Sequence, residues 1–425
     1  MRIAHFVQRY PPAIGGSEAF FARLSHYLAQ HGDQVDVYTT NARDLEAFWC
    51  AHGTRLPASS CAEHGLRIRR HPLRCLPYQR LWQRAARWVL PVGVRAWTTG
   101  GSPFVPSMWA AAGRRANYAV VHATAFPYTW PILCARRLAR RCRARWVLTP
   151  FLHLGNWLDP ADPMRHAYLA PELVALLKGA DLVIVQTRLE YQAVLAQGVP
   201  DERVRLLGMG VDPNECCGSD RVTARQRWGI APDAVVIGHL ANKSREKGTL
   251  DLLQALALLR PHADCVRLLL AGPEMTSFRD FWRALPDKQN IIRLGVLSEQ
   301  EKKDFYAAID IFALPSRSDS FGLVLLEAWA NGVPCVGYRA GGIAEVIRHG
   351  TDGWLVDCGD IAGLAAALDA FVRNTHLRRL CGARGRAKVL ACHAWPPLLA
   401  RVRAWYYELL TNAPSPGLTQ PRSAA

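Results

Sequence analysis

The feature that most constrains the fold is a repeated alternation of short aliphatic runs with amphipathic helical segments, a pattern typical of parallel α/β sheets. The alternation occurs in two series. Strands of the first series are predicted at residues 3–7, 35–38, 118–122, 146–148, 182–185 and 204–206. Strands of the second series are predicted at residues 235–238, 266–271, 291–294, 311–314, 335–337 and 353–356. The sequence therefore predicts an α/β protein with two doubly wound, Rossmann-like domains.

A polar stretch after residue 212 separates the two series. The 425 residues suffice for two domains of roughly 200 residues each. We expect the first domain at 1–212, the second at 213–394, and a helix at 395–411. Residues 412–425 are rich in Pro, Ser and Gly and predict a disordered tail. Because ligands of such folds bind at the carboxyl ends of strands, we expect a cleft where the strand ends of the two sheets face each other.

The positive charge of the chain is concentrated in one segment. The net charge is +17, and no acidic residue occurs between Glu63 and Asp159. The tryptophans of this arginine-rich segment include Trp82, Trp88, Trp97 and Trp109. Arginine mixed with tryptophan suits the headgroup region of an anionic membrane, and solvated helix faces are the alternative interpretation. No nucleic-acid-binding pattern is present, so nucleic acid is not an expected partner.

The cysteines and the hydrophobic runs bear on location. The twelve cysteines are scattered without a Cys-x-x-Cys pair, which favours a reducing cytosol. The N-terminus begins with a strand pattern rather than a signal peptide. No run reaches the roughly 18 to 20 apolar residues of a membrane-spanning helix. We expect a cytoplasmic protein, with peripheral attachment to the inner face of the membrane as the consequence if the basic segment binds lipid.

The most informative segment, residues 314–334, reads LPSRSDSFGLVLLEAWANGVP. A strand leads into a polar loop, Ser320 is the predicted N-cap, and a helix is predicted at 321–330. The backbone N–H groups at its start are those of Gly322, Leu323 and Val324. They carry the positive end of the helix dipole and predict an anion site. Glu327 has a carboxylate that is able to accept both hydroxyls of a ribose.

Two acids separated by seven residues, Asp319 and Glu327, stand in this segment. Together with GGIAEVI at 341–347 and DGWLV at 352–356, they resemble the family-4 retaining glycosyltransferases of the GT-B fold, also called group 1 glycosyltransferases. The resemblance covers most of the chain. This chain has Asp319 where the family usually has Glu. By resemblance, Asp319 binds hydroxyls of the donor sugar and Glu327 binds the ribose of the nucleotide.

The resemblance also assigns roles to the two domains. It implies an acceptor side in residues 1–212 and a nucleotide-sugar site in residues 213–394, with the helix at 395–411 crossing back to the first domain. The expected co-substrate is a nucleotide diphosphate sugar, linked to UDP or GDP, and no cofactor is expected. The expected acceptor is a saccharide or a lipid-linked molecule.

A second cluster at 238–248 reads GHLANKSREKG and is again a strand, a polar loop and a helix start. In the family, an arginine and a lysine of this loop neutralise the diphosphate as the glycosidic bond breaks. Lys247 matches the lysine. His239 occupies the usual place of the arginine, so Lys243 or Arg245 is left to supply the second cation. A solvated run of charges is the alternative interpretation.

Two further sites precede helices or follow strands. Gly15 and Gly16 stand at the turn before a helix at 19–30, where they permit close backbone approach to a ligand, or form a plain tight turn. His153 follows the strand at 146–148 and resembles the active-site histidine of the family, although a lone histidine is more often structural. The turn contains no Gly-x-Gly-x-x-Gly, which argues against a nicotinamide enzyme.

The metal-binding motif Asp-x-Asp is absent from the sequence, and His and Cys show no zinc spacing. We therefore expect metal-independent, retaining transfer of a sugar to an acceptor hydroxyl, with Lys247, Asp319 and His153 as the catalytic residues. The expected role is the assembly of a cell-surface polysaccharide or glycolipid. Two alternatives remain open: a sugar-nucleotide epimerase, and a catalytically weak assembly protein that keeps the fold.

Overall fold

The structure is a computed structural model that describes residues 1–76, 78–99, 101–156, 159–259 and 265–411. The chain forms two compact units. The first unit contains Met1–Thr149, Ala175–Val183 and the described residues from 399 to 411. The second contains Pro150–Val174 and Ile184–Leu398. The predicted tail at 412–425 lies outside the described residues, and a domain division at residue 212 stays a prediction.

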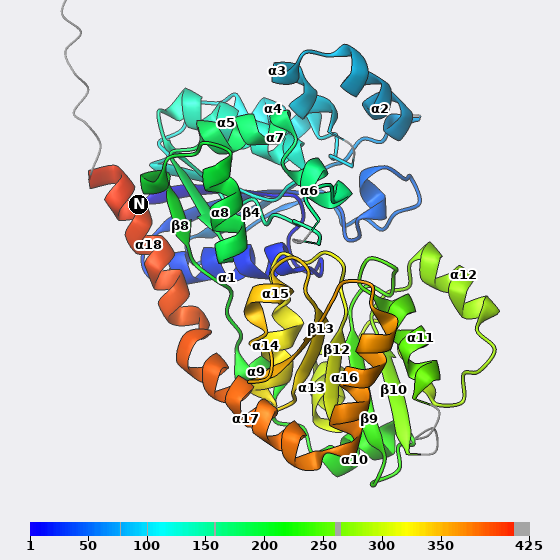
Figure 1. The fold of residues 1–425 in the computed structure, drawn as a ribbon. Coiled ribbons are helices and arrows are strands. Elements are labelled where there is room, and N and C mark those ends of the chain that lie inside the picture. Colours follow the sequence, from blue (N-terminus) through cyan, green and yellow to red (C-terminus); the bar gives the residue numbers. More distant parts are fainter. Residues whose placement is uncertain (77, 100, 157–158, 260–264, 412–425) are drawn as a thin grey trace, which may run out of the picture. The chain divides into compact units, whose positions relative to one another are not determined.

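The first sheet, of which β4 and β8 are labelled in Figure 1, has eight strands in the order β3-β4-β2-β1-β5-β6-β7-β8. The strands are β1 Arg2–Val7, β2 Gln34–Thr40, β3 Ser60–Glu63, β4 Leu66–His71, β5 Val120–Ala123, β6 Arg145–Leu148, β7 Leu182–Val185 and β8 Val204–Leu206. All pairings between β1, β2, β4, β5, β6 and β7 are parallel, whereas β3 pairs with β4 in the antiparallel direction.

The six strands predicted for this sheet are all present, but β3 and β4 were missed. β3 is exposed along its whole length, and β4 reads LRIRRH, so its arginines obscure the alternation that marks a strand. β3 is the edge strand of the sheet, and β4 lies between β3 and β2; most of the β4 side chains are only partly buried, which leaves room for its arginines.

Helices cover both sheets, and their bounds are as follows. In the first half of the chain they are α1 Gly16–Gln30, α2 Gln79–Val89, α3 Val92–Arg95, α4 Pro106–Ala112, α5 Thr129–Cys142, α6 Pro163–Tyr168, α7 Pro171–Gly179 and α8 Arg188–Ala196. In the second half they are α9 Pro213–Cys216, α10 Arg221–Arg227, α11 Thr249–Leu258, α12 Thr276–Ala284, α13 Glu299–Ala308, α14 Leu323–Ala330, α15 Ile343–Val346, α16 Ile361–Arg373, α17 Thr375–Cys392 and α18 Trp395–Thr411. Three short 3₁₀ turns lie at Glu46–Phe48, Ala96–Thr98 and Asp201–Arg203.

The C-terminal part of α18 packs within the first unit. Arg403 donates a hydrogen bond from Nε to Oδ2 of Asp33, at 2.7 Å. Tyr406 is fully buried and its hydroxyl bonds to Nδ1 of His122 on β5. The last helix of the chain is thereby joined to residues more than 280 positions earlier.

The second sheet has the predicted six strands, all parallel, in the order β11-β10-β9-β12-β13-β14. They are β9 Val235–Leu240, β10 Val266–Ala271, β11 Ile291–Arg293, β12 Ile311–Leu314, β13 Cys335–Tyr338 and β14 Gly353–Val356. The strand order runs from β9 through β10 to β11 and then reverses to β12 on the other side of β9. In doubly wound sheets the carboxyl ends of the two strands at such a reversal flank the ligand site.

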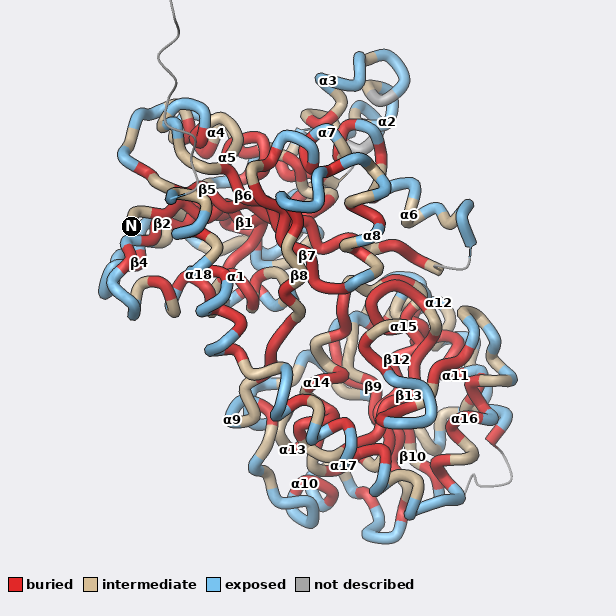
Figure 2. Tube along the Cα trace, turned by 60° about the vertical axis from the view of Figure 1, so that its left-hand side comes forward, coloured by how far each residue is buried: buried red, intermediate tan, exposed pale blue. Residues whose placement is uncertain are grey.

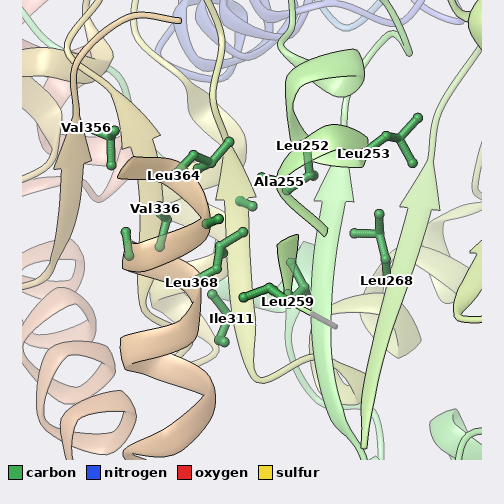
Figure 3. Close-up of a cluster of buried hydrophobic side chains, with 14 of the residues drawn as sticks. Leu252, Leu253, Ala255, Leu259, Leu268, Ile311, Val336, Val356, Leu364 and Leu368 are labelled. Atoms are coloured by element: carbon green, nitrogen blue, oxygen red, sulfur yellow. The ribbon is translucent and has the colours of Figure 1, made fainter. Parts of the chain in front are cut away.

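A continuous apolar core supports this sheet. Leu268 of β10, Ile311 of β12 and Val336 of β13 pack against leucines of α11 and α16, all buried (Figure 3). The central strands of both sheets are buried along most of their length, whereas many loops and outer helix faces are exposed (Figure 2). The core therefore holds β9 and β12 in place, and the polar loops that follow these strands are positioned by it.

Candidate functional site

The loops that follow β9 and β12 meet at the strand reversal of the second unit. The ammonium of Lys247 donates a hydrogen bond to Oδ2 of Asp319 at 2.7 Å. Gly248, beside this lysine, has φ +71°, and a Cβ there would lie 1.7 Å from the carbonyl oxygen of Pro315. Only glycine permits this approach between the two loops. The sequence thus places a cation and a carboxylate of two different motifs side by side.

Asp319 is an ionised carboxylate in this arrangement. Burial alone would raise its pKa, but the positive charge of Lys247, together with the hydrogen bonds that Asp319 accepts from Lys247 and from the backbone of Phe321, outweighs burial and holds the pKa below its ordinary value. Both side chains of the Lys247–Asp319 pair keep some access to solvent. The pair is therefore charged, oriented and reachable by a ligand.

His153 lies next to this pair, in the loop after β6. Burial and Lys247 lower its pKa to about 4, against the opposing effects of Asp319 and of a hydrogen bond to the backbone of Ser318. The ring is therefore neutral at pH 7. It packs against Tyr168 in a tilted arrangement, with 5.1 Å between ring centroids and 33° between the ring planes. Its Nδ1 is buried without a hydrogen-bond partner among the described residues.

The three other polar candidates of the β9 loop differ in their surroundings. His239 is fully buried, and its ring joins the carbonyl of Ala313 to the hydroxyl of Thr249, at 2.8 and 2.9 Å. Lys243 is also fully buried and bonds to the carbonyl of Leu294, with Oε1 of Glu274 at 3.4 Å. Arg245 is exposed. Of the two residues left open as second cation, only Arg245 has a side chain that reaches solvent.

Helix α14 begins two residues later than predicted. Its N-cap is Gly322, at φ +87°, and no side chain caps the helix, so the prediction of Ser320 as N-cap is wrong. The physical reason is the close packing of the preceding loop. The backbone of Gly342 lies so close to Ser320 that a Cβ on Gly342 would be 2.1 Å from the carbonyl oxygen of Ser320. Leu323 and Val324 form the first turn of α14, as part of the predicted anion site.

Glu327 lies on the side of α14 that contacts α13, and two residues of α13 donate hydrogen bonds to its carboxylate. Lys302 donates to Oε1 at 2.9 Å and the hydroxyl of Tyr306 donates to Oε2 at 2.8 Å. Each carboxylate oxygen keeps further acceptor capacity. Lys302 and Tyr306 were not predicted as site residues, although their spacing of four residues on one helix face indicates that they can share a partner.

The segment 341–342 supports the loop that carries Asp319. Gly342 donates its N–H to the carbonyl of Asp319 at 2.8 Å, and Gly341 donates to the carbonyl of Gly155 at 2.7 Å. A Cβ at Gly341 would lie 2.2 Å from the carbonyl oxygen of Asp319. These glycines hold Asp319 and the loop of His153 in register through backbone contacts alone.

Gly15 and Gly16 belong to the first unit. Gly15 is the N-cap of α1 and Gly16 its first residue. A Cβ on Gly15 would lie 2.2 Å from Oε2 of Glu18. Glu18 is buried and paired with Arg9 at 2.7 Å, so this turn is ordered by an ion pair that the sequence motif did not reveal.

In the part of the chain that the structure describes, no group of three or more His, Cys, Asp or Glu side chains is arranged to hold a metal ion. Among the described helices, none is long and apolar enough to cross a membrane.

Comparison with known proteins identifies the family of the chain. Residues 220–388 match the family of glycosyl transferases group 1, and residues 15–210 match the glycosyl transferase 4-like domain. An N-acetyl-alpha-D-glucosaminyl L-malate synthase of Bacillus anthracis is 30% identical over 214 residues, which are 50% of this chain and 56% of that protein. A D-inositol 3-phosphate glycosyltransferase of Corynebacterium urealyticum is 27% identical over 417 residues, covering 93% of this chain and 91% of that protein.

Solved structures share the fold at low sequence identity. A sucrose-phosphate synthase of Thermosynechococcus elongatus superposes with a TM-score of 0.74 at 20% identity, over 97% of this chain and 100% of that one. HepE of Anabaena, solved in complex with UDP, superposes with a TM-score of 0.68 at 19% identity, over 96% and 100%. With both domain matches and these neighbours, the chain belongs to the group 1 glycosyltransferases and has the GT-B fold.

Proposed function

We propose that this protein transfers a sugar from a UDP-linked donor to an acceptor hydroxyl and retains the configuration of the anomeric carbon. The observation that carries the proposal is the charged pair of Lys247 and Asp319 at the strand reversal of the second unit, with neutral His153 beside it. UDP is preferred over GDP because structural neighbours are solved with UDP and with UDP-glucose.

In this proposal the diphosphate is bound by Lys247 and by the start of α14. The first N–H groups of a helix have no partner within the helix and favour an anion. The ammonium of Lys247 also donates a hydrogen bond to the carbonyl of Ser318, at 3.5 Å, in the loop that precedes α14. Fixed cations and dipoles of this kind stabilise the charge that develops on a departing phosphate. The chain then needs neither a metal ion nor a cofactor, because its own groups meet the charge.

The two acids of the motif bind the two sugars of the donor. Oδ2 of Asp319 accepts a hydrogen bond from Lys247, and Oδ1 accepts the backbone N–H of Phe321 at 3.4 Å and keeps acceptor capacity for a hydroxyl of the donor sugar. Glu327 accepts from Lys302 and Tyr306 and keeps acceptor capacity for ribose hydroxyls. The shorter Asp at position 319 moves its carboxylate back by one methylene relative to Glu, which favours a donor sugar that fills that space.

The reaction breaks the bond between the anomeric carbon and the phosphate oxygen and forms one to the acceptor oxygen on the same face of the sugar. The acceptor proton passes to the departing phosphate oxygen, so charge and atoms balance without a protein nucleophile. Neutral His153 contributes a hydrogen bond and a flat surface rather than charge.

The test is a transfer assay with a panel of UDP- and GDP-linked sugars, in which the anomeric configuration of the product is read by NMR. We expect transfer from one UDP-sugar with retention, and unchanged transfer in the presence of EDTA. Inverted product would overturn the mechanism, and a strict requirement for Mg²⁺ or Mn²⁺ would overturn the assignment of the diphosphate to Lys247 and α14.

Peripheral attachment to an anionic membrane is part of the proposal. Exposed apolar side chains gather on α2 and after it: Trp82 is 69% exposed, Trp88 88% and Val89 81%. They alternate with arginines such as the exposed Arg84, in a segment without acids. A surface with aromatic rings and arginines suits the headgroup region rather than water. This favours a lipid-linked acceptor and a role in glycolipid or cell-surface polysaccharide assembly.

A further inference from the structure

A hollow in the first unit is lined by four arginines and is not used by the proposed reaction. Its volume is about 540 Å³, within the range of roughly 300–1,000 Å³ of small-molecule sites. The arginines are Arg136, Arg140, Arg143 and Arg145, from the end of α5 and the start of β6. The remaining walls are Ala119, Ala139, Ala144, Trp146, Gly179, Asp181 and Leu410.

The hollow lies at the amino ends of the strands. Val120 of β5 pairs with Arg145 of β6, and Val147 of β6 pairs with Leu182 of β7, all in parallel. Residues directly before these strands line the hollow, whereas the loops that carry Gly15 and His153 follow the carboxyl ends of β1 and β6. In a parallel sheet the two sets of loops are at opposite edges. The hollow is therefore a separate place from any site built on the carboxyl ends.

The charges in the hollow are not balanced within it. Asp181 is the one acid of its lining among the described residues, and it is already engaged. Its Oδ2 accepts the backbone N–H of Trp146 at 2.7 Å, and its Oδ1 lies 3.8 Å from Arg145. Burial lowers the pKa of Arg136, and the neighbouring charge of Arg140 lowers it further. Crowded cations of this kind are relieved when an anion binds.

The residue types indicate which anion fits. All four cations are arginines, whose planar forks bind phosphate oxygens in pairs, and none is a lysine. The indole of Trp146 is 5% exposed, with the guanidinium of Arg136 at 6.0 Å from its ring centroid. The alanines, Gly179 and Leu410 give the hollow small, apolar walls. Such a lining suits a compact phosphate with a short carbon skeleton better than a long polymer.

We propose that this hollow binds a phosphate monoester, distinct from the sugar-nucleotide donor. The monoester comes either from a small soluble molecule or from the headgroup of a phospholipid. It binds at the amino edge of the sheet in the first unit, through the four guanidinium groups.

The test follows the indole N–H of Trp146 by NMR in protein labelled with ¹⁵N-tryptophan, as glycerol 3-phosphate is added. The Trp146→Phe variant assigns the resonance. We expect it to shift in a saturable way. The double variant Arg140→Gln/Arg143→Gln should weaken binding about 10-fold or more, because each lost guanidinium removes charged hydrogen bonds. A resonance that does not move, or an unchanged affinity in the double variant, would overturn the proposal.

Two controls separate the hollow from other sites. Arg114→Gln/Arg115→Gln removes the same charge from exposed arginines of the same unit and should leave the titration unchanged. Lys247→Ala should leave it unchanged as well, even if it abolishes donor binding, so the two proposals fail independently. If the Arg114→Gln/Arg115→Gln variant weakened binding equally, the effect would be due to net charge alone, and the proposed phosphate site would be overturned.

A second arm identifies the source of the phosphate. Sedimentation with phosphatidylcholine vesicles, with and without phosphatidic acid, is compared for the parent and the Arg140→Gln/Arg143→Gln variant. A loss of binding to phosphatidic acid in the variant assigns the headgroup. Equal sedimentation, with the NMR shift still lost, assigns the soluble monoester.

Discussion

Positive charge is concentrated in two regions, the loops after β9 and β12 and the acid-free segment at 64–158. The two regions differ in whether their cations are paired with nearby acids. In the loops and the helices beside them, Lys247 is paired with Asp319, Lys243 with Glu274, and Lys302 with Glu327. In the acid-free segment, no carboxylate of the same segment can pair with an arginine. A paired cation is held in one place before a ligand arrives, whereas a cation without a local acid relies on an anion from elsewhere in the protein or from outside.

The strongest way to break this comparison is to remove paired lysines one at a time. Lys247→Ala should lower turnover by about 10²- to 10³-fold, or about 2.7–4 kcal/mol, because it deletes the cation proposed to face the leaving phosphate. Its thermal stability should change little, since the lysine is partly exposed. Steady-state kinetics and a melting curve measure both effects.

Lys243 provides the contrasting control from the same loop. Because its ammonium is fully buried and bonds to the carbonyl of Leu294, Lys243→Ala should lower stability, by about 1–3 kcal/mol. Near-normal turnover of a folded Lys247→Ala protein would contradict its place in the site. A fall in turnover with Lys243→Ala at unchanged stability would show that Lys243, not Lys247, meets the phosphate.

The buried His239 allows a prediction about pH. Burial lowers its pKa to about 4 from an ordinary 6.5. Between these two pH values the histidine is protonated in the unfolded chain but stays neutral in the folded protein. The free energy of unfolding therefore does not depend on the titration of this histidine above pH 6.5, and it falls by roughly 3 kcal/mol as the pH is lowered toward 4. Urea unfolding at several pH values should show this slope, and His239→Gln should reduce it. Exposed His26→Gln should leave it unchanged; an equal reduction there would contradict the assignment.

Asp319 tests whether the charge or only the hydrogen bonds of the pair matter. Asp319→Asn keeps the size but removes the charge that orients Lys247, and should cost about 1.5–3 kcal/mol of transition-state stabilisation. Asp319→Glu keeps the charge and should retain activity, with altered preference among donor sugars. The ratio kcat/KM over the donor panel measures both. Equal activity of the Asn variant would show that the carboxylate charge is irrelevant.

The smallest expected effect concerns the acid-free segment. Each basic residue near an anionic membrane contributes about 1 kcal/mol to binding, so Arg84→Gln should weaken binding to anionic vesicles about fivefold. Added salt should weaken the parent in the same direction. Arg279→Gln, an exposed arginine of the second unit, is the matched control. If Arg84→Gln sediments with vesicles as well as the parent does, α2 does not face lipid, and its charge belongs to a solvated surface.

The sequence predicted the fold to the extent that hydrophobic pattern determines it. All strands of the second sheet were predicted within two residues at either end, because both faces of a parallel sheet are buried and its strands are apolar. β4 was missed because its arginines hide the alternation. The family and the GT-B fold were also predicted correctly, from the resemblance carried by Asp319, Glu327 and the segments at 341–347 and 352–356.

The contacts of the candidate site were less predictable. The pairing of Lys247 with Asp319 joins residues 72 positions apart, and local patterns do not report contacts at that distance. The same holds for Glu327, whose partners Lys302 and Tyr306 are on the preceding helix. The cap at Gly322 was missed because Ser320 has the better capping side chain. The start of the helix is instead determined by tertiary packing around the carbonyl of Ser320.

Gly341 and Gly342 contribute no side-chain atom to the site, yet they determine where Asp319 stands. A methyl group on Gly341 would lie 2.2 Å from the carbonyl of Asp319, and one on Gly342 would lie 2.1 Å from that of Ser320. Either alanine would have to displace the loop. In the proposed function Asp319 binds the donor sugar, so an added carbon at Gly341 or Gly342 is expected to alter the choice of donor sugar by moving Asp319. Engineering of this enzyme for a new donor has a target that inspection of the ligand-facing side chains alone would overlook.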